Sequence, residues 1–168
     1  MKPVLRAARE KLKSVTPLKK DCGRVCDAAC CRSAEGEETG VLLFPGEEET
    51  YGGKDGWTIR ETAMGPMVIC PGKCEREERP LACRLFPLLP VIGADGEVRV
   101  AVDLRAKAVC PLARQGRNAM DPVFTEAVRE AGKLLATEED QTVFLEKLAE
   151  EQEELKRLRR TLGGGACV

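Results

Sequence analysis

Histidine is absent from this 168-residue chain, and aromatic residues make up only 4% of it. Without histidine, the chain lacks the commonest general base and the commonest nitrogen ligand for metals. Zinc sites of the Cys₂His₂ and Cys₃His kinds are therefore excluded. The scarcity of aromatic rings predicts a core built mainly from aliphatic side chains.

Long apolar runs and a strong excess of one charge are also missing. No stretch approaches the ~18 apolar residues that a membrane-spanning helix needs. The N-terminal stretch MKPVLRAAREKLKSV carries charges throughout and does not resemble a secretory signal. The formal net charge is −1, which gives no argument for binding nucleic acid. These absences predict a cytoplasmic protein with neither a nucleic-acid nor a membrane partner.

Cysteine is abundant instead, with nine residues. Clustered cysteines in a reducing compartment more often bind metal or do redox work than form structural disulfides. An all-thiol set suits an iron–sulfur cluster, zinc or Cu(I). Cys167 lies apart near the C-terminus and is not expected to be a ligand. The candidate metal ligands are Cys22, Cys26, Cys30, Cys31, Cys70, Cys74, Cys83 and Cys110.

The segment DCGRVCDAACC places Cys22, Cys26 and Cys30 at intervals of four residues. On a regular helix the outer two would lie ~12 Å apart along the axis. One zinc ion holds its sulfurs within about 4 Å of one another. The spacing therefore predicts either that this segment is not a regular helix or that its thiols divide between sites. The adjacent Cys30 and Cys31 are expected to point to different sides.

Proline follows two of the cysteines, Cys70 and Cys110, as it follows a ligand cysteine in bacterial ferredoxins. This pattern favours a 4Fe-4S cluster, with a four-cysteine zinc site as the second choice. Arg79, Arg84 and Arg105 lie near cysteines in the sequence. Each could offset the charge of a metal-bound thiolate, or it could form a surface ion pair.

Four segments together carry a family resemblance: DCGRVCDAACC, LLFPGEEE, RPLACRLFPLLP and RAKAVCPL. They resemble the YkgJ-type cysteine-cluster family, which is described as a zinc- or iron-chelating domain. The resemblance covers roughly residues 16–115. It implies a metal site but no particular reaction, and the first run here has three-residue spacings where the family has two. By the resemblance, Cys22, Cys26, Cys30 and Cys31 carry the first run, Cys83 the second element and Cys110 the last.

Two other functions stay open. The wider circle of that family includes flagellin lysine methylases, so the first is an iron–sulfur enzyme or electron-transfer partner working with S-adenosylmethionine or thiol chemistry. A radical S-adenosylmethionine site needs Cys-x₃-Cys-x₂-Cys, however, and Ala29 stands where its third cysteine would be required. The second is a structural zinc module that contacts a partner protein through its C-terminal helices.

Local patterns predict an α+β fold, with an irregular metal-centred domain over residues 1–120 and a helical extension packed on it over 121–168. Pro80 is expected to open a helical turn, and Trp57 to lie in the core. Asp121 should cap one C-terminal helix, and Thr137 with Asp140 should form a capping box for the next. The expected elements are helices at 3–15, 122–136 and 137–162, an acidic helix start at 47–49, strands near 41–44, 57–60 and 67–70, a hairpin from 88–92 and 98–102, a loop at 35–39 and a frayed tail at 163–168.

Overall fold

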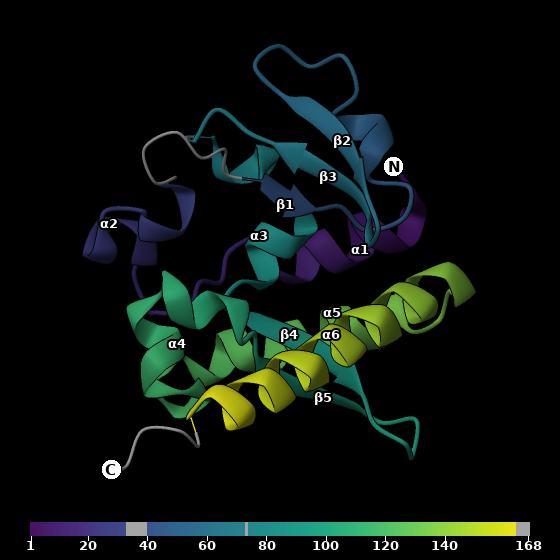
Figure 1. The fold of residues 1–168 in the computed structure, drawn as a ribbon. Coiled ribbons are helices and arrows are strands. Elements are labelled where there is room, and N and C mark those ends of the chain that lie inside the picture. Colours follow the sequence, from purple (N-terminus) through teal and green to yellow (C-terminus); the bar gives the residue numbers. More distant parts are fainter. Residues whose placement is uncertain (33–39, 73, 164–168) are drawn as a thin grey trace.

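The computed structural model describes residues 1–32, 40–72 and 74–163 (Figure 1). Helices and short antiparallel strands make up this part of the chain, which confirms the predicted α+β class. The predicted loop at 35–39 lies outside the described residues, as does Cys167 with the rest of the tail beyond residue 163. No helix in the described ranges is both long enough and apolar enough to cross a membrane.

Three short strands form an antiparallel sheet in the order β1-β3-β2. They are β1 (Gly40–Leu42), β2 (Thr58–Thr62) and β3 (Gly65–Ile69), close to the positions that the sequence predicted. Val68 of the central strand is fully buried and packs with Trp57, which is only 8% exposed. Trp57 also stacks on Tyr51, with ring centroids 4.9 Å apart, so its predicted place in a core is confirmed.

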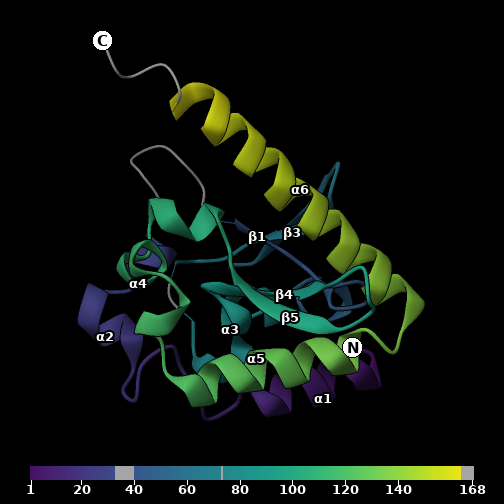
Figure 2. The ribbon, with the colours of Figure 1, turned by 90° about the horizontal axis from the view of Figure 1, so that it is seen from below.

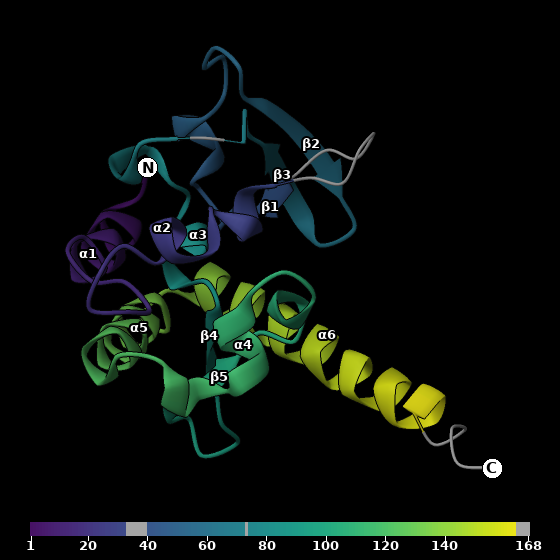
Figure 3. The same cartoon turned by 90° about the vertical axis from the view of Figure 1, so that its left-hand side faces the viewer.

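A two-stranded hairpin forms a second sheet, from β4 (Leu88–Ile92) and β5 (Val98–Val102). Gly96 adopts a left-handed φ of +78° in its turn, as the Asp95-Gly96 pair predicted. Figure 3 shows the three-stranded sheet on one side of the molecule and the hairpin with its helices on the other. The short helix α3 (Leu81–Leu85) lies between the two (Figure 1) and follows Pro80 as expected.

The N-terminal helix α1 (Pro3–Lys11) is shorter than the predicted 3–15. Its apolar face, which includes Leu5 and Ala8, is fully buried against the helix α5 (Pro122–Leu135). The prediction was wrong about its end because Arg76, in the 3₁₀ turn η3 (Arg76–Glu78), takes over the free carbonyls there. The Arg76 guanidinium donates to the carbonyls of Leu12, Lys13 and Val15. A basic side chain can satisfy helix-end carbonyls in this way.

Two helices close the chain, α5 (Pro122–Leu135) and α6 (Glu139–Gly163). The carboxylate of Asp121 accepts a hydrogen bond from the Val123 N–H at 2.9 Å, which confirms the predicted cap. The predicted capping box at Thr137 is wrong. The Thr137 hydroxyl donates back to the Leu134 carbonyl at 2.7 Å, so this residue completes the end of α5 and α6 starts two residues later.

The main core lies where α1, α5 and α6 meet the β4–β5 hairpin, with α5 running beside α1 (Figure 2). It is largely aliphatic, as expected, although Phe44 and Phe144 meet edge to face at 5.0 Å. The first half of α6 is buried through Leu145 and Leu148. Its second half extends past the hairpin, where Leu162 is 80% exposed. The C-terminal helices therefore pack on the rest of the chain.

Candidate metal centre

The first cysteine run folds as a broken helix. A short helix α2 (Cys22–Cys26) is followed by two left-handed residues and then by the 3₁₀ turn η1 (Ala29–Cys31). Asp27 and Ala28 have φ values of 51° and 49°, which costs residues other than glycine roughly 1–2 kcal/mol each. This confirms one predicted alternative, that the run is not a regular helix. The break places Cys22 and Cys26 on one element and Cys30 and Cys31 on the next.

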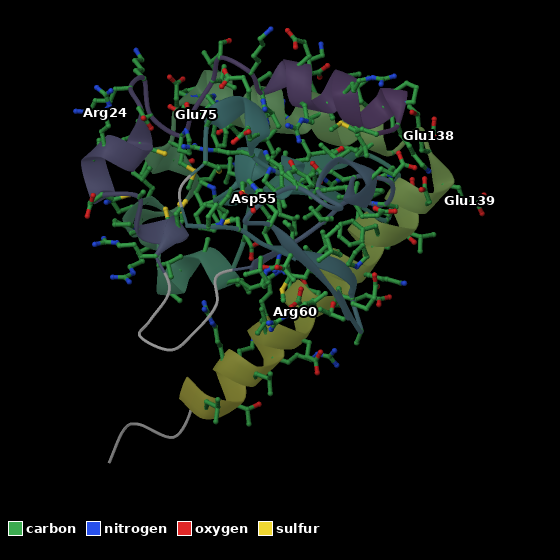
Figure 4. The ribbon with its side chains drawn as sticks, turned by 90° about the horizontal axis from the view of Figure 1, so that it is seen from above. Arg24, Asp55, Arg60, Glu75, Glu138 and Glu139 are labelled. Atoms are coloured by element: carbon green, nitrogen blue, oxygen red, sulfur yellow. The ribbon has the colours of Figure 1, made fainter. Side chains whose placement is uncertain are left out.

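Five cysteines from three separate segments line one cavity of about 370 Å³. Cys30 and Cys31 come from η1, Cys70 and Cys74 from the turn that follows β3, and Cys83 from α3. Figure 4 shows sulfur atoms gathered beside α2, on the side of the molecule where Arg24 and Glu75 are labelled. The predicted convergence of distant thiols is therefore found for these five. Cys22, Cys26 and Cys110 lie outside the lining.

Close backbone contact brings the second segment to the first. Gly72 has a left-handed φ of +81°, and a Cβ atom there would lie 3.4 Å from the carbonyl oxygen of Cys31. The backbone at Gly72 thus runs against η1. Cys70 and Cys74 also pack against the buried cluster around Val68. The sheet core therefore supports one wall of the cavity.

A buried carboxylate holds the third segment. Glu47 is fully buried, and its Oε1 accepts hydrogen bonds from the Leu81 N–H at 2.7 Å and from Arg9 at 3.0 Å. Its Oε2 accepts from the Phe44 N–H at 3.3 Å. Burial raises the pKa of Glu47, while the bond from Leu81 and the charge of Arg9 oppose that rise. These bonds fix the start of α3, which carries Cys83.

The role of Glu47 was missed in the sequence, where residues 47–49 were expected to start a helix. The structure has only a 3₁₀ turn there, η2 (Glu48–Thr50). Three consecutive glutamates offer no local sign of which one turns inward. Only the apolar run that precedes them hints that the first lies close to a core.

Four of the cavity thiols act on one another electrostatically. We call Cys31, Cys70, Cys74 and Cys83 the inner thiols. Burial raises the pKa of Cys83, and the charges of the other three inner thiols raise it further. Burial also raises the pKa of Cys74, with Cys70 and Cys31 adding to the rise. The directions of these shifts agree with the place of all four residues in the lining of one cavity.

Cys30 and Cys31 do not point to different sides, contrary to expectation. Their sulfur atoms lie 3.9 Å apart, and both line the cavity. The tight 3₁₀ turn after two left-handed residues turns both side chains the same way. Their contact raises the pKa of Cys30 and, with the charge of Arg79, lowers the pKa of Cys31 to about 6.

The remaining three cysteines, Cys22, Cys26 and Cys110, form what we call the outer thiols. The Cys26 thiol donates to the carbonyl of Cys22 at 3.4 Å. Burial raises the pKa of Cys22, and the charges of Cys26, Asp21 and Cys110 add to this. Cys110 is buried and precedes α4 (Pro111–Gln115). The pKa of Cys30 is raised by its contact with Cys31 and by burial, and the charges of Cys83 and Cys22 add to this.

Of the three arginines considered from the sequence, only Arg79 faces thiols. Burial lowers its pKa, but the charges of Cys74 and Cys31 and a hydrogen bond to Cys74 raise it by more. Its Nε is buried and has no partner among the described residues. Arg84 is buried and donates to the carbonyls of Glu77 and Arg79, so both predictions for it were wrong. Arg105 forms ion pairs with Asp103 at 2.7 Å and Glu151 at 2.9 Å.

The chemistry of the cavity wall fits a soft metal centre, because five thiols are among the residues that line it and the chain has no histidine. The eight cysteines in the described ranges are all free thiols. Within these ranges, no three Cys, Asp or Glu side chains already form a group that could hold a metal ion. Comparison with protein-family models, curated proteins and solved structures found no match to this chain. The resemblance to the YkgJ-type family stays a prediction.

Proposed function

We propose that this protein binds a 4Fe-4S cluster or zinc through the inner thiols Cys31, Cys70, Cys74 and Cys83. The observation that carries the proposal is their meeting at one cavity from three segments far apart in the sequence. Nothing in local secondary structure requires such a meeting.

Of the two metal centres, the iron–sulfur cluster is the first choice. A ligand set made of cysteine thiolates alone is the usual one for such clusters, and this chain has no histidine. Cys70 and the proline after it also match the ferredoxin pattern. When bound, a cluster supplies one-electron chemistry, whereas zinc would cross-link the three segments.

The chain's own residues have separate tasks in this proposal. Arg79 offsets negative charge at Cys74 and Cys31, which favours their thiolate forms. Glu47 holds the start of α3 and so positions Cys83. The left-handed pair Asp27 and Ala28 turns Cys31 toward the cavity. Free thiols also fit the reducing cytoplasm, which we propose as the compartment.

The predicted set of eight ligands separates here into two groups. The outer thiols Cys22, Cys26 and Cys110, with Cys30 next to them, would make a second four-thiol set. The metal-to-protein ratio tests whether this second set binds metal. A second centre would double the number of metal atoms per chain that the inner thiols alone can bind.

The direct test is elemental analysis and a visible spectrum of the full chain purified without oxygen. We expect iron with an equal amount of sulfide and broad absorption near ~400 nm. Colourless, zinc-loaded protein would support the structural zinc module instead. The exposed Leu158 and Leu162 of α6 would then be its contact surface for a partner protein. Protein that takes up neither metal would refute the proposal.

Single replacements assign the ligands. We expect Cys83→Ser to lose most of the bound metal, because Cys83 lies within the inner thiols and is held by α3. Cys167→Ser is the matched control, since that cysteine is far from the others in the sequence, and it should keep the full metal content. Equal metal loss in both variants, measured by elemental analysis, would contradict the assignment.

A further inference from the structure

The thiols line only part of the cavity, and most of the remaining wall is apolar. This apolar part comes from elements on both sides of α3, namely β1, β4 and α6. Several of its side chains are buried or partly buried residues that turn one surface to the cavity. They include Leu42, Phe44, Phe86, Leu89, Phe144 and Leu148.

Most charged groups in the wall already have partners, although the buried Nε of Arg79 has none among the described residues. Arg79 faces Cys74 and Cys31. At the other end, Arg105 and Asp103 pair with each other, and Gln152 donates to the same carboxylate at 3.0 Å. A phosphate, sugar or nucleotide would therefore have to bury polar groups against apolar side chains, which is costly. The volume of about 370 Å³ lies within the range of small-molecule sites, roughly 300–1,000 Å³.

We propose that this cavity binds a small neutral molecule with an apolar body, whose single polar end lies toward the thiols. The inference rests on the proposed function in one respect, because the metal centre is taken to fill the thiol end. The apolar body then lies against the side chains that β1, β4 and α6 contribute to the cavity, and its polar end lies beside the metal centre. This makes the cavity a substrate or effector site for that centre.

Two exposed valines provide a matched pair of variants. Val109 lines the cavity and is 40% exposed, so a larger side chain there can enter the cavity without disturbing the core. Val143, on α6, is 43% exposed and lies outside the lining. We expect Val109→Trp to weaken binding of 1-octanol by at least about tenfold, and Val143→Trp to leave it unchanged. Binding is measured by titration calorimetry on the full, metal-loaded chain.

A second probe, with a hydroxyl group at each end, tests whether the end of the cavity far from the thiols is apolar. The diol 1,8-octanediol has the same body as 1-octanol but a second hydroxyl group, which would be buried at that end without a partner. We expect it to bind about tenfold more weakly, the factor that corresponds to one unsatisfied buried polar group. Equal affinity for the two alcohols would refute an apolar end.

Outcomes for the cavity and for the metal are distinguishable because metal content is measured in the same samples. Loaded protein that does not bind 1-octanol, or whose two tryptophan variants bind it equally, would overturn this inference and leave the metal proposal standing. Metal-free protein that binds 1-octanol, with loss only in Val109→Trp, would overturn the metal proposal and support the cavity. If Val109→Trp does not fold, Ala82→Leu in α3 fills the same cavity and is judged by the same criteria.

Discussion

Glu47 illustrates how a single residue can organise several elements. Its carboxylate joins Arg9 of α1 to the N–H groups of Phe44 and Leu81. Taking a carboxylate out of water costs several kcal/mol, and the bonds from these three donors offset that cost. Because the carboxylate and its donors have a fixed geometry, Glu47 also sets where α3 begins and hence where Cys83 lies.

We expect Glu47→Gln to lower the free energy of unfolding by about 3 kcal/mol. The substitution leaves the positive charge of the poorly exposed Arg9 without its carboxylate partner, and it turns an amide N–H toward other donors. Urea unfolding at neutral pH measures the change. Glu49→Gln is the control, since the exposed Glu49 pairs with the N-terminal amine of Met1 and should matter little. A similar loss in both variants would refute the role of the buried charge.

Packing between elements depends on a close approach of α5 to the hairpin. Gly132 lies inside α5, where glycine is usually about 1 kcal/mol less favourable than alanine. A Cβ atom at this position would lie 2.5 Å from Cβ of Pro90 and 2.8 Å from Cγ1 of Val98. Both neighbours belong to rigid residues of the hairpin. The glycine therefore allows the helix and hairpin to touch.

We expect Gly132→Ala to lower the free energy of unfolding by about 1–3 kcal/mol despite its better helix propensity, because it overpacks the contact. Gly52→Ala is the same substitution at a site without a left-handed φ, where the nearest atom is an ordinary 3.5 Å away. That control should be neutral or slightly stabilising. A stabilised Gly132→Ala variant in urea unfolding would show that the helix can move away freely.

For the whole molecule, the main consequence of the proposal is a link between distant segments. The inner thiols come from η1, the turn after β3, and α3, which otherwise meet through Gly72 and Glu47. A ligand that binds only where these segments meet stabilises the folded chain by mass action. If the proposal holds, global stability depends on metal content.

We expect metal-loaded protein to unfold at a higher urea concentration than protein stripped with a chelator. The gain should be about 2.7 kcal/mol if free metal is present at a hundredfold excess over its dissociation constant. Cys83→Ser should remove most of this difference, whereas Cys167→Ser should preserve it. Identical midpoints for loaded and stripped wild-type protein would contradict a metal bound across the three segments.

Local sequence signals predicted most of the elements. The Asp95-Gly96 turn and the Asp121-Pro122 helix start depend on residues that are neighbours in the chain, so their pattern was readable. The predicted end of α1 failed because Arg76, a residue far along the chain, binds its last carbonyls. The predicted capping box failed because Thr137 serves the end of the preceding helix.

By itself, the sequence determined which donor atoms are present: nine thiols and no imidazole. That composition limits the metal chemistry whatever the fold. Only the tertiary structure decided that five thiols share one cavity, that Arg79 rather than Arg84 or Arg105 faces them, and that Glu47 holds one of their helices. The reason is physical: donor chemistry belongs to each side chain alone, whereas distances between side chains far apart in the chain depend on how the whole molecule packs.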